Sequence, residues 1–154
     1  MPKLYMMVGV PGCGKTTWIK NQLWTRDCVV VSTDFFVEHH AMSTGLTYSE
    51  VFESYMPTAV ELMANQVVRA REDGKDIIWD QTSTTVATRR KKFNMLPDYY
   101  AIAVVFPVPP VQELVRRLTS RPGKNIPMSV VTNMINNFDM PTEEEGFKEI
   151  WRAT

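Results

Sequence analysis

The sequence predicts an α/β fold with one parallel β-sheet of about four or five strands and helices on both faces. Short apolar runs rich in β-branched residues alternate along the 154-residue chain with longer segments whose apolar residues recur every three or four positions. This alternation is typical of a parallel sheet. The length predicts a single domain over residues 1–154. With 44% hydrophobic and 22% charged residues, the chain is not a mainly disordered protein.

Four apolar runs predict the strands of the sheet. Each is short and ends near a turn residue or a polar residue, as a buried strand does. The runs are residues 4–10, 28–32, 76–79 and 100–106. A small further strand is expected around Ile150 and Trp151. Trp79 lies within the third run, and we expect its side chain to be buried.

Helices are predicted between and after these strands. They cover residues 15–24, 48–72, 84–95, 111–120 and 129–138. Pro57 either interrupts the long second helix or opens a new one, and Gly74 stops it. No element is assigned to residues 33–47, and the acidic run 143–145 is expected as a helix start or a solvated turn.

Several classes of protein are excluded by composition. The longest apolar stretch, residues 101–110, is about half of what a bilayer crossing needs. The first residues do not form a signal peptide, because a glycine-rich turn follows them at once. Cys13 and Cys28 are too few for a disulfide scaffold, so we expect a cytoplasmic protein with reduced thiols. Structural zinc is not expected, since paired Cys or His spacings are absent.

Charge is distributed unevenly along a chain whose formal net charge is zero. Residues 27–80 hold ten acids and three bases, whereas residues 89–124 hold eight bases and two acids. The basic segment predicts a wall that faces a phosphorylated ligand, and a merely solvated face is the alternative.

Residues 9–16, GVPGCGKT, match the pattern G-x-x-x-x-G-K-[ST] between a predicted strand and a predicted helix. Glycines let successive backbone N–H groups point at phosphates, and the helix N-terminus adds a positive dipole end. The sequence therefore predicts a phosphate loop that binds ATP. Its expected nucleotide ligands are Gly9, Pro11, Gly12, Cys13, Gly14, Lys15, Thr16 and Thr17. Lys15 would bridge the β- and γ-phosphates and the Thr16 hydroxyl would coordinate Mg²⁺, while Cys13 is either a small residue that fits or a reactive thiol.

Two carboxylates lie just beyond predicted strands. Asp34 follows the second strand and Asp80 follows the third, and ligands of open α/β sheets bind at the carboxyl ends of strands. A kinase needs a carboxylate that takes the proton of the acceptor hydroxyl and another near the metal. Asp34 suits the first role. Asp80 suits the second, acting on Mg²⁺ through water or holding Thr16; helix N-capping is the alternative for both.

Arginines gather in the predicted helix 111–120 and in the loop after it. Arg117 and Arg121 are four residues apart, so they share one helical face if the helix continues. Arginine donors stabilise the charge that phosphoryl transfer spreads over the phosphate oxygens. The pair predicts an arginine-bearing lid in which both residues are catalytic and Arg121 also binds ATP. Surface salt bridging is the alternative, and Arg116 is expected to point into solvent.

These segments resemble the polynucleotide 5′-hydroxyl kinases, a family of P-loop kinases, over nearly the whole chain. GVPGCGKTTW resembles their phosphate loop, VSTDFF their general-base strand with Asp34, and DIIWDQTSTTVATRR their segment with Asp80. ELVRRLTSRPGKNIP resembles their lid, with the two family arginines at Arg117 and Arg121. MPTEEEGFKEI resembles their closing stretch, with Phe138 just before it. The lid and the closing stretch together are more specific than the phosphate loop.

The resemblance implies a P-loop NTPase/kinase fold and transfer of the ATP γ-phosphate to the 5′-hydroxyl of DNA or RNA. It implies Asp34 as general base, Lys15 and the lid arginines as phosphate ligands, and Mg²⁺ as cofactor. A nucleic acid with a 5′-hydroxyl end is the implied partner. Many members carry a 3′-phosphatase domain with a D-x-D-G-T motif; this chain lacks the motif and resembles a kinase-only version.

One departure concerns the acceptor side. Phage members have an arginine shortly after the general base that grips a phosphate of the acceptor strand, and Val37 stands there in this chain. His39 or His40 takes its place, or the two histidines lie in a surface loop. Residues 41–54 have no match in the family and lie where an acceptor would bind.

Three functions therefore stay open. The first is a polynucleotide 5′-kinase. The second is a kinase of another hydroxyl, on a nucleoside, a small metabolite or a hydroxymethylated base in DNA, which the loss of the arginine favours. The third is a nucleotide-binding switch module without catalysis.

Overall fold

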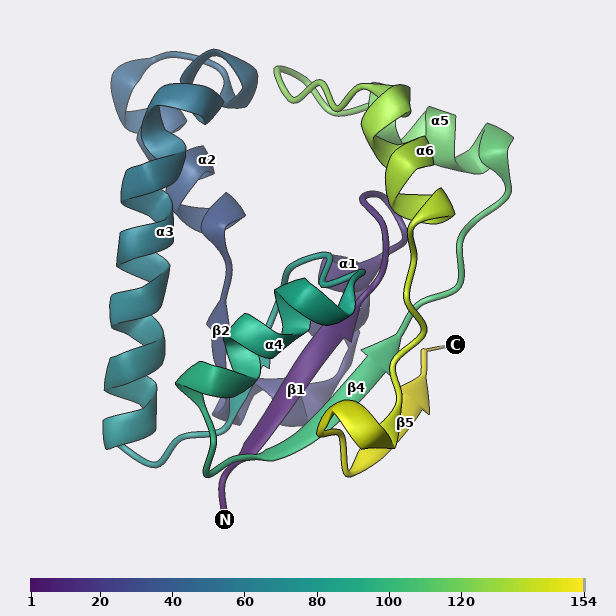
Figure 1. The fold of residues 1–154 in the computed structure, drawn as a ribbon. Coiled ribbons are helices and arrows are strands. Elements are labelled where there is room, and N and C mark those ends of the chain that lie inside the picture. The colour runs from purple at the N-terminus through teal and green to yellow at the C-terminus, as the bar shows by residue number, and fades with distance from the viewer. Residues whose placement is uncertain (154) are drawn as a thin grey trace.

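The computed structural model describes residues 1–153 as a parallel five-stranded sheet with helices on both faces (Figure 1). The strands are β1 (Lys3–Val8), β2 (Val29–Val31), β3 (Ile77–Trp79), β4 (Tyr100–Val105) and β5 (Glu149–Arg152). The helices are α1 (Lys15–Asn21), α2 (Thr33–Thr44), α3 (Tyr48–Glu72), α4 (Val86–Met95), α5 (Val111–Thr119) and α6 (Met128–Asn136). Short 3₁₀ helices cover Leu23–Asp27 and Glu143–Glu145. The strand order is β2-β3-β1-β4-β5, and the predicted fold class is confirmed.

Each face of the sheet has its own apolar core, because alternate residues of a strand point to opposite sides. Leu4 and Met6 of β1 belong to the core that includes Met63 of α3. Tyr5 and Met7 belong to the other core, which includes Ile19 of α1, Leu114 of α5 and Val131 of α6. Trp79 is buried in the first core as predicted, with 2% of its surface exposed. Burial on both faces explains why the strands read as continuous apolar runs.

Helix α2 begins directly after β2, in a segment where the sequence predicted no element. The Ser32 hydroxyl accepts a hydrogen bond from the Asp34 N–H at 3.1 Å, so Ser32 is the N-cap of the helix. Val37 and Ala41 are buried with residues of α3, whereas Phe35 and Met42 are exposed. Apolar residues on several sides of the helix hide the periodicity that predicts one.

Helix α3 is continuous over the predicted residues, with Pro57 inside it. Thr47 caps its first turn in a capping box: Thr47 Oγ1 accepts the Glu50 N–H, and Glu50 Oε1 accepts the Thr47 N–H. His39 and His40 lie on helix α2 and not in a loop. Among residues 1–153, no helix is both long and apolar enough to cross a bilayer.

The basic segment does not form one surface. Arg89 of α4 is 0% exposed, and its Nε lies 2.6 Å from Glu145 Oε1. Arg89 Nη1 also donates to the Ser83 carbonyl at 2.9 Å. Lys92 is 7% exposed and donates to Ser83 Oγ at 2.8 Å. Arg89 and Lys92, which the sequence placed in a basic surface, are therefore buried and make structural contacts inside the protein. Glu145 of the acidic run takes part in these contacts.

Lys92 makes stability depend on pH. Burial, together with Arg89 and Lys91, lowers the pKa of Lys92 from 10.5 to about 8. Between these values the unfolded chain binds more protons than the folded one, so the contribution of Lys92 to the free energy of unfolding rises with pH. We expect wild type to gain about 2 kcal/mol relative to Lys92→Met between pH 7.5 and 10, as measured by urea unfolding. A difference that is constant across these pH values would contradict this prediction.

Candidate active site

The phosphate loop connects β1 to α1 at the carboxyl edge of the sheet. Gly12 and Gly14 have φ angles of +82° and +102°, which glycine adopts without strain. A Cβ on Gly12 would lie 3.1 Å from Leu114 of α5, so the loop also packs tightly beneath this helix. The Gly9 N–H donates to the Thr82 carbonyl at 2.9 Å, which connects the loop to the segment after β3. The local sequence thus forms the predicted cradle.

Lys15 lies inside this cradle. Its ammonium donates to the carbonyls of Gly9 and Val10, both at 3.0 Å. The ammonium is therefore held at the loop, where phosphates would bind. Cys13 is buried beside it, and burial raises the pKa of the thiol although Lys15 opposes the rise. This favours Cys13 as a small residue that fits over Cys13 as a reactive thiol.

The Thr16 hydroxyl donates to Asp80 Oδ2 at 3.1 Å. This contact matches one of the two roles expected for Asp80 from its place after β3, that of holding Thr16. Burial raises the pKa of Asp80, and the charge of Asp34 adds to the rise, while Lys15 and the Thr16 hydrogen bond oppose it. Within residues 1–153 no group of three or more His, Cys, Asp or Glu side chains could hold a metal ion. A hydroxyl beside a carboxylate fits Mg²⁺ whose other ligands are phosphate oxygens and water.

Asp34 lies in the first turn of α2, next to the strand that carries Asp80. Tyr48 donates its hydroxyl to Asp34 Oδ1 at 2.6 Å, and Lys124 Nζ lies 3.0 Å from Asp34 Oδ2. Burial alone would raise the pKa of Asp34, but Lys124 and the Tyr48 hydroxyl outweigh it and hold the pKa below its ordinary value. Asp34 is therefore ionised at neutral pH, while its side chain stays half exposed.

Sequence reasoning assigned no role to Tyr48 or Lys124. Tyr48 lies 14 residues from Asp34 and Lys124 lies 90 residues from it, so no local pattern links them. The one available signal for Lys124 was its place in the predicted lid. Burial and the hydrogen bond to Asp34 raise the pKa of Tyr48, which keeps its hydroxyl protonated as a donor.

The two predicted lid arginines occupy different places. Arg117 Nη1 donates to the Gly12 carbonyl at 2.9 Å, and Arg117 Nε donates to Glu113. Helix α5 ends at Thr119, so Arg121 does not share its face and lies instead in the loop to α6. There Arg121 lines a pocket of about 280 Å³ with residues of that loop and of the α3 start. Arg116 was expected to point into solvent, and it lies on the surface, where it pairs with Glu113.

Residues 120–127, the lid loop, reach from α5 to the start of α3 (Figure 1). The Ser49 N–H donates to the Gly123 carbonyl at 3.0 Å, and the Asn125 N–H donates to Ser49 Oγ at 2.8 Å. These bonds hold the lid loop against the start of α3, so that it links the β4 half of the chain to the β2 half. The side chains of Asp34 and Lys124 meet beneath it.

Replacing Gly123 by alanine is expected to detach the lid loop. Gly123 has φ +71°, and a Cβ there would lie 2.9 Å from Thr47 Cβ. Gly45 is a matched control, since it has φ +73° and open space around its missing Cβ. Both variants carry the backbone cost of about 1 kcal/mol, but only Gly123→Ala displaces the loop. We expect faster tryptic cleavage after Lys124 in that variant alone, because Pro122 blocks cleavage after Arg121. Equal digestion of the two variants would contradict the prediction.

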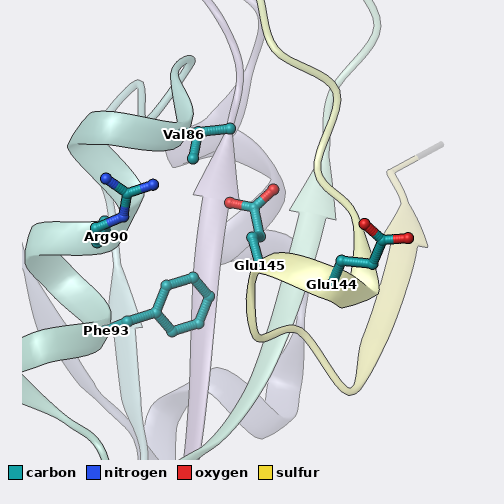
Figure 2. A pocket seen from close by; sticks show the side chains of 5 residues that line it. All are labelled: Val86, Arg90, Phe93, Glu144 and Glu145. Carbon is teal, nitrogen blue, oxygen red and sulfur yellow. The ribbon is translucent and has the colours of Figure 1, made fainter.

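A second pocket lies away from these residues, between α4 and the closing segment. It encloses about 220 Å³ and is lined by Val86, Arg90, Phe93, Glu144 and Glu145. Figure 2 shows Arg90 and Phe93 projecting from one helix and Glu145 facing them from the closing segment. No predicted site residue lines this pocket. The phosphate loop, both carboxylates and the lid therefore form the candidate site.

Comparisons with known proteins agree with this description. The family model AAA_33, an AAA domain, matches residues 4–141. A protein of Chloroflexus aurantiacus J-10-fl, provisionally described as a kinase, superposes with a TM-score of 0.72 at 20% identity, covering 99% of this chain and 84% of that one. Shikimate kinase from Acinetobacter baumannii superposes with a TM-score of 0.57 at 19% identity, covering 100% and 84%.

A chain of the Pnkp1/Rnl/Hen1 RNA repair complex is also similar. It superposes with a TM-score of 0.70 at 25% identity and is matched over 88% of this chain. Only 43% of that chain is covered, so this chain spans less than half of its length. The matches share the P-loop kinase fold, and they include both a shikimate kinase and a chain of an RNA repair complex.

Proposed function

Because the chain belongs to the AAA_33 family of AAA domains and has a P-loop kinase fold, we propose that it transfers the γ-phosphate of ATP to the 5′-hydroxyl of DNA or RNA. The observation that carries the proposal is the arrangement of two carboxylates around one phosphate loop. Asp80 contacts Thr16 of the loop, and Asp34 stands at the end of the neighbouring strand. One carboxylate thus serves the donor side and the other serves an acceptor hydroxyl.

On the donor side, the backbone N–H groups of the loop and the Lys15 ammonium would bind the phosphates. Thr16 would hold Mg²⁺, with Asp80 fixing the hydroxyl at 3.1 Å. The nucleotide and its metal supply the phosphoryl group and partly neutralise its charge. Arg117, already at the Gly12 carbonyl, is poised to add a guanidinium to the phosphate oxygens, and Arg121 would join it from the lid loop.

On the acceptor side, Asp34 would accept the proton of the 5′-hydroxyl as the hydroxyl oxygen forms its bond to phosphorus. The carboxylate is ionised at neutral pH and half exposed, so it is available to an incoming hydroxyl. Tyr48 would orient it through the 2.6 Å hydrogen bond to Oδ1. A site that holds the general base and the acceptor hydroxyl in a fixed relative orientation gains much of its rate enhancement from that orientation.

A kinase of another hydroxyl is the second candidate, and one observation favours it. Val37 is fully buried in α2, so this helix offers no cation to an acceptor phosphate at the place where the resemblance leads one to expect arginine. An uncharged acceptor would not need that cation. The acceptor would then be a nucleoside, a small metabolite or a hydroxymethylated base.

The test is transfer of label from γ-labelled ATP with Mg²⁺ to matched oligonucleotides that carry a 5′-hydroxyl or a 5′-phosphate. We expect label on the 5′-hydroxyl strand alone, in both DNA and RNA series. Binding of the polynucleotide should weaken as salt rises. Absence of transfer with ATP binding intact would favour the second candidate, and a screen of nucleosides and metabolites would follow.

A further inference from the structure

Lys124 is the cation that lies against the candidate base. Its side chain is 9% exposed, and its Nζ lies 3.0 Å from Asp34 Oδ2 and 3.5 Å from Glu38 Oε1. The same ammonium stands 4.4 Å from the centre of the Tyr48 ring. One positive charge is thus shared between two carboxylates, and it occupies an oxygen that a general base would use.

The lid loop delivers this ammonium to the acceptor side of the site. The residues on either side of Lys124 are bonded to Ser49 at the start of α3, through the Gly123 carbonyl and the Asn125 N–H. Lys15, by contrast, is held at the carbonyls of the phosphate loop. The two lysines therefore serve opposite sides of the site, and their positions are set by different parts of the chain.

Helix α2 has no lysine or arginine that could replace Lys124, and its exposed His39 stacks on Phe35 with 6.2 Å between ring centroids. Val37 is fully buried, and the ring of His40 stacks on Tyr55 with 3.8 Å between centroids. Among the ion pairs that the structure describes for residues 1–153, those of Asp34 and Glu38 involve Lys124 alone. A phosphate brought beside these two acids would be repelled unless a cation moved to meet it.

We propose that Lys124 binds a phosphate group of the acceptor, and that its ammonium moves from Asp34 Oδ2 to this phosphate when the acceptor enters. The inference rests on the proposed phosphoryl transfer. Charge-assisted hydrogen bonds to phosphate are strong, so the Lys124 ammonium gains a new anionic partner when it leaves Asp34 Oδ2. It frees Oδ2 for the acceptor hydroxyl, while Tyr48 continues to hold Oδ1. The acceptor would then carry a phosphate close to its reacting hydroxyl, as a nucleoside 3′-phosphate or the end of a polynucleotide does.

The test compares three acceptors: a 5′-hydroxyl oligonucleotide, thymidine 3′-monophosphate and thymidine. We measure kcat/KM for each with wild type, Lys124→Ala and Lys124→Arg, and with Lys148→Ala as the control. Lys148 is exposed and precedes β5, at the edge of the sheet opposite the site. Wild type should prefer the two phosphate-bearing acceptors over thymidine. Lys124→Ala should lose about 10- to 100-fold on these two and much less on thymidine, and Lys124→Arg should restore part of the preference.

Other outcomes would overturn the inference. An equal loss on all three acceptors and on ATP hydrolysis without acceptor would mean that Lys124 only fastens the lid loop. A wild type that does not distinguish thymidine 3′-monophosphate from thymidine would also contradict it. Failure of the proposed function looks different, because wild type would then leave the 5′-hydroxyl oligonucleotide unphosphorylated. Thermal melting and ATP binding of each variant separate these outcomes from misfolding.

Discussion

Asp34→Asn is expected to lower kcat for transfer to a 5′-hydroxyl by about 10²- to 10⁴-fold, the usual contribution of a general base. The amide keeps the size of the side chain but does not take the proton of the acceptor. ATP binding should change little, since the loop residues that are proposed to hold the phosphates are untouched. Single-turnover transfer from labelled ATP and ATP titration measure the two effects separately.

Glu38→Gln is the matched control for this variant. Glu38 lies one turn further along α2 and also pairs with Lys124, at 3.5 Å. The change removes the same charge from the same ammonium while leaving Asp34 in place, so transfer should fall far less. If Asp34→Asn retained transfer near the wild-type rate, the assigned base would be wrong. If both variants lost transfer equally, the charge around Lys124 and not a proton acceptor would be responsible.

Arg89→Ala is expected to destabilise the fold by about 3–5 kcal/mol, the cost of leaving one partner of a buried ion pair alone. Arg89 is 0% exposed and Glu145 is 9% exposed, and two hydrogen bonds of 2.6 and 3.1 Å join them. Glu145 also accepts the Thr142 N–H, so this pair, together with the contact of Phe93 with Phe147, attaches α4 to the closing segment. Urea unfolding measures the loss.

Glu144→Ala is the control here, because Glu144 is exposed and neighbours the buried acid. It should change the free energy of unfolding by about 0.5 kcal/mol or less. A double variant, Arg89→Met with Glu145→Leu, should recover much of the loss, since well-packed apolar side chains often replace a buried pair without cost. A loss below about 1 kcal/mol in Arg89→Ala would show that the pair contributes little to stability.

Local patterns in the sequence predicted most of the fold. The bounds of α3 agree with the apolar spacing of residues 48–72, and the Thr47–Glu50 capping box explains its start. The phosphate loop and the contact of Thr16 with Asp80 follow from a motif and from the rule that ligands bind at strand ends. These features depend on residues close in sequence or on the topology of a parallel sheet.

Contacts between distant residues were not predictable in the same way. Lys124 meets Asp34 across 90 positions, and Arg89 meets Glu145 across 56. Nothing in a basic segment tells which of its members turn inward to a buried partner and which face solvent. Helix α2 was missed for a different reason, because its apolar residues lie on the exposed as well as the buried side. Both difficulties apply around Asp34, which lies on the unpredicted helix α2 and pairs with the distant Lys124.

The hairpin of α2 and α3 has a small core of its own, formed by Val37, Ala41, Val51 and Ala59, apart from the two cores of the sheet. It carries Asp34 and Tyr48, whereas the phosphate loop lies on β1 and α1. Under the proposed function, acceptor choice therefore lies in a hairpin with a core of its own, which Met63 and Val67 of α3 attach to the sheet. Such a unit can diverge or be exchanged while the nucleotide-binding half stays unchanged, which is a route by which one kinase scaffold acquires new acceptors.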